Sequence, residues 1–97
     1  MPAYLIAEIA VTDAEAYKAY TSRVPDLIAK AGGRYLVRGG KTAAVEGGPV
    51  AGRIVVLEFQ NFAAAEAFYH SQDYQAILAF RTNASTGRVY LVDGMAR

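Results

Sequence analysis

The stretch AYLIAEIAV, residues 3–11, indicates the fold more clearly than any other part of the chain. Its β-branched and aromatic residues favour a strand, and apart from Glu8 it is apolar at both sets of alternating positions. The stretch RIVVLEF, residues 53–59, has the same character, with Glu58 as its acidic residue. Both stretches are therefore predicted to be central strands of a sheet whose two faces are covered.

Helical periodicity follows the first of these strands. Thr12 and Asp13 offer an N-cap, and apolar residues then recur at three- and four-residue spacing until the glycine pair at residues 32–33. A glycine pair is a typical helix end. Pro25 lies inside this segment, so a kink or short break is expected near residues 23 and 24.

The rest of the chain is predicted to add three strands and a second helical region. Residues 34–38 and 88–92 are predicted to be two further strands, and a glycine-rich loop fills residues 39–52. After the strand at residues 53–59, Asn61 and Ser71 are each predicted to cap a helical segment. A glycine-rich loop of this kind suits the rim of a pocket better than a core.

The order strand, helix, strand, strand, helix, strand predicts one α+β domain over residues 1–97. We expect a ferredoxin-like βαββαβ fold, with a four-stranded antiparallel sheet and the helices on one face. The two central strands are apolar on both faces, and 54% of the 97 residues are apolar. A second copy of the chain is therefore expected to bury the open face, which gives a homodimeric α/β barrel.

Composition narrows the function classes. The chain has no cysteine and one histidine, so neither a disulfide framework nor a metal centre is expected. Its ten basic and nine acidic residues form no basic run of the kind that follows phosphates in nucleic acid. No apolar run reaches the roughly 20 residues of a membrane span, and the start lacks a signal-peptide pattern. We expect a cytoplasmic protein with no cofactor and no nucleic-acid or membrane partner.

Two glutamates are candidate catalytic residues. Glu8 and Glu58 alternate with apolar residues on the two central strands, and parallel neighbours would bring the two carboxylates together on the face away from the helices. Close carboxylates raise one another's proton affinity, which suits a general acid or base. The alternative is that each glutamate pairs with a nearby arginine.

Arginines beside glycine form the second candidate group. Arg38 is followed by Gly39 and Gly40, Arg53 begins the second central strand, and Arg81 lies on the last helical segment. Guanidinium groups beside glycine-rich backbone can hold a carboxylate or a phosphate through two hydrogen bonds. The same arginines, together with Arg34 on the second strand, could instead neutralise glutamates, and alternation does not fix which face they occupy.

The segment HSQDY, residues 70–74, joins two helical segments. His70 is a candidate base there, although a solvent-facing histidine at a helix end gives the same pattern. Ser71 and Tyr74 are candidate ligand contacts, and Ser71 is equally a helix cap. Most aromatic residues are expected in the core, but the strand tyrosines could line a cavity against the partner subunit: Tyr4, Tyr35 and Tyr90.

These residues carry a resemblance to a known family. The chain resembles the family called domain of unknown function 1330, in the dimeric α/β-barrel superfamily. The likeness spans nearly the entire chain and depends on residues 12–20, GRYLVRGG at 33–40, the strand at 53–59, SQDYQ at 71–75, and Arg81. The resemblance implies a ferredoxin-like monomer whose sheet packs on the sheet of its partner. It implies no particular reaction.

Two hypotheses about function remain open at this point. In the first, the protein is an enzyme that acts on a small anionic or aromatic metabolite in a pocket between the sheet and the dimer partner. Arg38 and Arg81 would anchor the metabolite, and Glu58, Glu8 or His70 would move protons. In the second, the protein is a non-catalytic homodimer that binds a small ligand or another protein.

Overall fold

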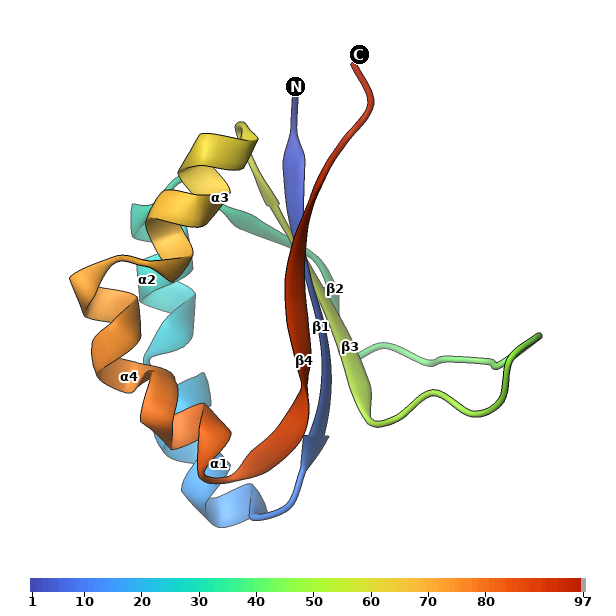
Figure 1. Ribbon diagram of the computed structural model, residues 1–97. Helices are drawn as coiled ribbons and strands as arrows, with labels where there is room; N and C mark the ends of the chain where they lie inside the picture. Colours follow the sequence, from blue (N-terminus) through green and yellow to red (C-terminus); the bar gives the residue numbers. More distant parts are fainter. Residues whose placement is uncertain (97) are drawn as a thin grey trace.

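The computed structural model describes residues 1–96, and Arg97, the last residue of the predicted domain, lies outside the described residues. Four strands and four helices alternate in two similar halves (Figure 1). In chain order they are β1 (Ala3–Val11), α1 (Ala14–Thr21), α2 (Val24–Lys30), β2 (Arg34–Arg38), β3 (Arg53–Phe59), α3 (Phe62–Tyr69), α4 (Gln72–Thr82) and β4 (Ser85–Asp93).

One four-stranded sheet organises the fold. Its strand order is β2-β3-β1-β4, and every neighbouring pair is antiparallel. Figure 1 shows the helices together on one face of the sheet. The predicted α+β, ferredoxin-like arrangement is confirmed. The expectation that the central strands are parallel is wrong, because the crossover through α1 and α2 makes β1 parallel to β2, and β3 runs back between them.

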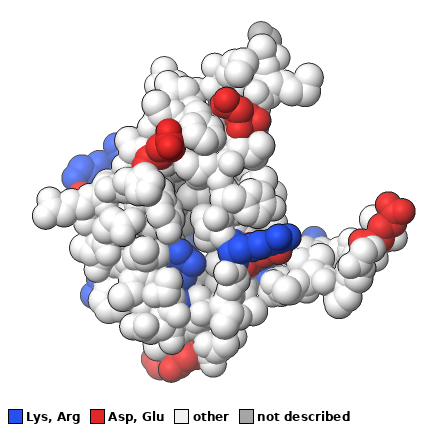
Figure 2. All heavy atoms as spheres, viewed as in Figure 1, with Lys and Arg blue, Asp and Glu red and all other residues white. Residues whose placement is uncertain are grey.

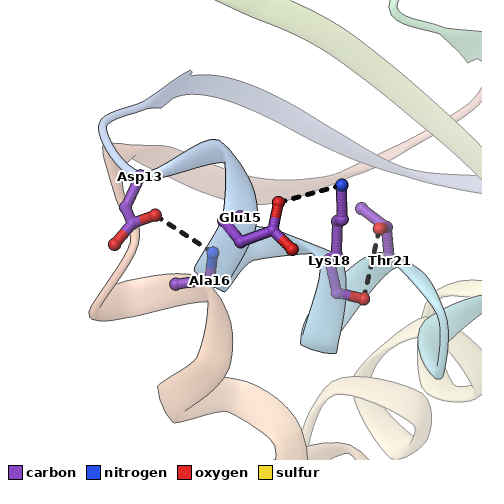
Figure 3. Close-up of polar contacts among 5 residues, drawn as sticks. All are labelled: Asp13, Glu15, Ala16, Lys18 and Thr21. Atoms are coloured by element: carbon purple, nitrogen blue, oxygen red, sulfur yellow. Dashed lines mark hydrogen bonds and ion pairs between the residues drawn. The ribbon is translucent and has the colours of Figure 1, made fainter.

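Side-chain caps begin three of the helices, as the sequence predicts. The backbone N–H of Ala16 donates to the Asp13 carboxylate over 3.0 Å at the start of α1 (Figure 3). Asn61 caps α3 and Ser71 caps α4 in the same manner. The break predicted by Pro25 is also present, since α1 ends at Thr21 and α2 begins at Val24.

Strand β4 is longer than the predicted residues 88–92. It begins at Ser85, which pairs with Val11 at the far end of β1. The extension was missed in the sequence because Gly87 lies within it, and glycine is uncommon in strands. Gly87 has a φ of 154°, and any Cβ there would collide with the backbone oxygen of Glu8.

The two faces of the sheet differ in what covers them. Alternate residues of β1, from Ala3 to Ile9, face the helices and are buried together with Leu57 and Phe59 of β3. Within residues 1–96 no helix covers the opposite face, where apolar side chains are half-buried or exposed: Tyr4, Ile6, Val37, Ile54, Val56, Tyr90 and Val92. The partner that the sequence predicts for this open face stays a prediction.

The segment between β2 and β3, residues 39–52, leaves the body of the molecule. Figure 1 shows it as a long arm on the side of the sheet away from the helices. Every residue of this arm is exposed, including Val45 at 89%. Across the described part of the chain, no helix is long and apolar enough to cross a membrane.

Candidate functional site

A cavity of about 240 Å³ lies between the helix layer and the sheet. Apolar side chains of β1, β3 and α2 form much of its wall. Its polar lining consists of three arginines, four tyrosines and one threonine: Arg38, Arg53, Arg81, Tyr17, Tyr20, Tyr35, Tyr74 and Thr21. Among the described residues, no aspartate or glutamate lines this cavity. Figure 2 shows basic side chains in the hollow between the helices and the sheet.

Arg81 is the most deeply placed of the three arginines. Arg81 lies on the same side of helix α4 as Tyr74, two turns further along. Only 8% of the residue is exposed. Its guanidinium carbon lies 6.0 Å from the centre of the Tyr20 ring. Burial opposes the charge, but the hydroxyl groups of Tyr74 and Tyr20 outweigh it and raise the pKa of Arg81. The Nε–H of Arg81 is buried and has no acceptor among the described residues.

Arg53, a half-buried residue, supplies a second guanidinium from the sheet. It starts β3 on the face that carries Val55 and Leu57, which is the helix-covered face. Its Nε is also buried without an acceptor in the described part of the chain. Gly39 lies directly over this group, since a Cβ at Gly39 would be 3.0 Å from Nη2 of Arg53. The backbone N–H of Gly39 donates to the oxygen of Ile54 over 2.8 Å, which holds the chain in this position.

Arg38 reaches the same cavity because of a β-bulge. The register between β2 and β3 shifts between Tyr35 and Val37. Simple alternation from Tyr35 would put Arg38 on the open face, but the extra residue turns it to the helix-covered face opposite Val55. Its guanidinium lies 4.4 Å from the centre of the Tyr35 ring. Arg38 is exposed, so it stands at the mouth of the cavity.

Tyrosine hydroxyls link the helices across the cavity. The hydroxyls of Tyr20 on α1 and Tyr74 on α4 are 2.8 Å apart and share a hydrogen bond. Burial raises the pKa of Tyr20 far above its usual value, and Tyr74 adds to the effect. Burial also raises the pKa of Tyr17 and of Tyr35. These three phenols therefore keep their protons at neutral pH and can donate hydrogen bonds to a ligand.

The two candidate glutamates do not come together. Glu8 lies opposite Ile54, and Glu58 lies opposite Tyr4, so the carboxylates share the open face but are offset by about 13 Å along the strands. Glu8 pairs with its cross-strand neighbour Arg88 over 3.1 Å. The predicted closeness is wrong because it assumed parallel strands.

Glu58 has an arginine partner as well. Arg34, its cross-strand neighbour on β2, approaches it to 2.8 Å. This pair lines a larger surface hollow of about 540 Å³ beside the chain termini. Because its basic and acidic side chains neutralise each other, this hollow is a weaker candidate for an anion site than the smaller cavity.

The remaining candidate residues lie outside the cavity. His70 is exposed at the end of α3, with its ring against Tyr69. Ser71 caps α4 and donates from its hydroxyl to the oxygen of Phe68 over 2.7 Å. Gly40 is exposed in the arm, with no described atom within 4 Å of an added Cβ. Of the predicted ligand-binding residues, the structure gathers the arginines and Tyr74 around the cavity.

Three of the tyrosines in the cavity lining were not predicted as site residues. Tyr17 and Tyr20 were assigned to the core because they fit the apolar stripe of a helix, and their hydroxyls gave no separate signal. For Tyr35 two positions were open, the core or a cavity against the partner subunit, and it lies opposite Leu57 on the helix-covered face. One usable signal was the seven-residue spacing of Tyr74 and Arg81, which places both on one face of a helix.

The fold defines a class of protein: a ferredoxin-like α+β domain with one four-stranded antiparallel sheet. Within this class, the chain belongs to the family described as Domain of unknown function (DUF1330), whose model matches residues 2–95. The resemblance inferred from the sequence is thus confirmed. No curated protein matches the sequence significantly.

Solved structures share this fold at low sequence identity. RPA0582, a protein of unknown function from Rhodopseudomonas palustris, is 18% identical with a TM-score of 0.75, and the match covers 99% of this chain and 84% of that one. SnoaB, a cofactor-independent oxygenase from Streptomyces nogalater, is 10% identical with a TM-score of 0.61, over 99% and 95%. Rv0793 from Mycobacterium tuberculosis is 16% identical with a TM-score of 0.58, over 100% and 98%. At these identities the likeness shows the fold.

Proposed function

We propose that this protein binds a small anionic metabolite with an apolar or aromatic body in the cavity between the helices and the sheet. One observation carries the proposal. Three arginines line the cavity, two of them have a buried Nε–H without an acceptor, and no carboxylate from the described residues lines the wall with them. Arginines kept only for structure would be expected to have carboxylate partners, as Arg34 and Arg88 do.

Electrostatics explains why an anion would be preferred. A buried cation without a partner is costly, and an anionic ligand that accepts from the free guanidinium edge removes that cost. The neutral phenols of Tyr17, Tyr20 and Tyr35 can donate further hydrogen bonds to the same ligand. The apolar wall from β1 and β3 would contact the rest of the molecule.

Binding is favoured over proton-transfer catalysis by the groups that line the cavity. The ionisable ones among the described residues are arginines and tyrosines, and neither type is a ready base at neutral pH. Glu8, Glu58 and His70, which the sequence offered as proton carriers, lie outside this lining. An enzymatic role for this cavity would have to use binding, orientation or donation from the hydroxyl pair of Tyr20 and Tyr74.

We also propose that a second copy of the chain covers the open face of the sheet. The apolar side chains that remain exposed there, including Tyr90 and Val92 at 42% each, support this arrangement. Glu8 and Glu58 are satisfied by arginines on the same face, so the pairing would not bury free carboxylates. The cavity itself is built by one chain and lies on the other side of the sheet.

The test is a comparison of acids with their neutral amides. Thermal unfolding is recorded with benzoate and phenylacetate and with benzamide and phenylacetamide, which have similar shapes without the charge. A ligand at about a hundred times its Kd adds about 2.7 kcal/mol to stability, so the acids should raise Tm by several degrees and the amides should not. Arg81→Met should remove the shift, whereas Lys41→Gln, which removes an exposed charge from the arm, should keep it. Equal shifts from acids and amides would contradict the proposal.

A further inference from the structure

We propose that the cavity selects a doubly charged ligand, a short dicarboxylate or a small phosphate ester, and that Arg53 and Arg81 each hold one anionic group or one side of a phosphoryl group. This inference rests on the proposed function, because it names the charge and size of the anion in the same cavity.

The guanidinium groups of Arg53 and Arg81, here called the two clamps, come from different parts of the fold. Arg53 comes from β3 and Arg81 from α4, so they approach the cavity from its two walls. Each has a buried Nε–H without an acceptor among residues 1–96. The Nε–H and one terminal N–H of a guanidinium form an edge that suits a carboxylate or phosphate. Two such edges call for two acceptor groups.

Tyr17 shows that both clamps serve the same compartment. Burial raises the pKa of Tyr17, and the charges of Arg53 and then Arg81 act against this rise. Tyr17, Arg53 and Arg81 all line this one cavity, so an anion inside it can approach both guanidinium groups.

Charge balance favours two negative charges over one. The cavity wall carries three guanidinium groups, and no carboxylate from the described residues offsets them. A monoanion satisfies one of the two buried Nε–H groups and leaves the other without an acceptor, which is costly. A dianion can satisfy both Nε–H groups, and Arg38, exposed at the mouth, adds a third positive charge there.

The volume limits how large this dianion is. The cavity volume of about 240 Å³ lies below the roughly 300–1,000 Å³ of common ligand pockets. A ligand on the order of ten non-hydrogen atoms fits, such as a dicarboxylate with a four- or five-carbon chain. A nucleotide or a flavin does not.

Isothermal titration calorimetry with matched probes tests the inference. Succinate and glutarate are compared with succinamate and glutaramate, which replace one carboxylate by an amide of similar shape. We expect each dicarboxylate to bind at least about tenfold more tightly than its monoamide, the difference that one charged hydrogen-bonded contact makes. Phenyl phosphate at pH 8 is titrated separately as the phosphate ester. Whichever binds more tightly, the dicarboxylates or phenyl phosphate, identifies the chemical class of the dianion.

Variants then assign the two clamps. Arg53→Met and Arg81→Met should each weaken the dianion and bring it level with the monoamide, while Lys41→Gln should leave the preference unchanged. Arg53→Lys and Arg81→Lys keep the charge and should recover part of the preference, which separates lost binding from a misfolded variant.

Three results would overturn the inference, and they differ in what they say of the proposed function. If monoamides bind as tightly as dicarboxylates, or if either Met variant keeps the full preference, the doubly charged ligand is refuted and the anion site stands. If neither the dianions nor the monoanions bind, both the inference and the proposed function are refuted.

Discussion

Replacing Gly39 with alanine is expected to damage both stability and the site. Gly39 has a φ of 71°, in the left-handed region where a residue with a Cβ loses about 1–2 kcal/mol. The new Cβ would also lie 3.0 Å from Nη2 and 3.1 Å from Nε of Arg53. Because these atoms end a flexible side chain, the guanidinium is expected to move and the backbone to stay.

The expected loss can be measured as a shift in Tm. For a domain of this size, 1 kcal/mol corresponds to about 4–8 °C, so the change should lower Tm by about 4–16 °C. Gly40→Ala is the matched control, since Gly40 lacks a positive φ and no described atom lies within 4 Å of its added Cβ. That variant should stay within about 0.5 kcal/mol of the parent, or gain slightly from a less flexible unfolded chain.

Thermal unfolding by circular dichroism and titration with succinate provide the two readouts. Gly39→Ala should weaken binding beyond what its lower stability explains when both proteins are titrated well below Tm. If the two alanine variants unfold at the same temperature, the assigned backbone conformation is wrong. If Gly39→Ala unfolds early but binds normally, the close approach to Arg53 does not position the clamp.

Three further predictions concern the hydroxyl pair, the pH range and the open face. Tyr74→Phe removes the hydrogen bond to Tyr20 and should lower the free energy of unfolding in urea by about 1 kcal/mol. The double variant Tyr20→Phe/Tyr74→Phe should lose clearly less than the sum of the losses of its two single variants. Burial raises the pKa of Tyr20, so above about pH 10 the unfolded chain loses a proton that the native chain keeps. The contribution of Tyr20 to stability is therefore intact below that pH, and above it the free energy of unfolding falls by up to about 1.4 kcal/mol per pH unit. A urea midpoint that stays flat from pH 9 to 11 would contradict this. Val56→Glu should turn a dimer into a monomer in light scattering at micromolar concentration, whereas Val45→Glu on the exposed arm should not.

Much of the fold could be predicted from the sequence because local chemistry determines it. The bounds of β1, β2 and β3 match the predicted residues, and the caps at Asp13, Asn61 and Ser71 are present. Each of these features depends on a few neighbouring residues. The periodicity of an apolar strand and the hydrogen bond of a cap need no knowledge of the rest of the chain.

The candidate site was harder to predict because it depends on which face each side chain occupies. A single bulge in β2 moves Arg38 to the helix-covered face. The residue types between Tyr35 and Val37 do not predict this bulge. The direction of β3 relative to β1 decides that Glu8 and Glu58 stand apart. The bulge and the direction of β3 are both properties of strand pairing across the fold. The arginines could therefore be predicted as ligand-binding residues from the sequence, whereas the cavity that they share could not.

The position of β1 in the middle of the sheet affects how the chain folds during synthesis. β1 leaves the ribosome before both of its neighbours in the sheet, β3 and β4. At about 5–20 residues per second, the stretch AYLIAEIAV waits for several seconds before β3 is available to pair with it. An apolar strand without a partner invites aggregation, and one internal charge is a common protection against it. Glu8, placed within this strand and later neutralised by Arg88 of β4, can protect the nascent chain until its last strand arrives.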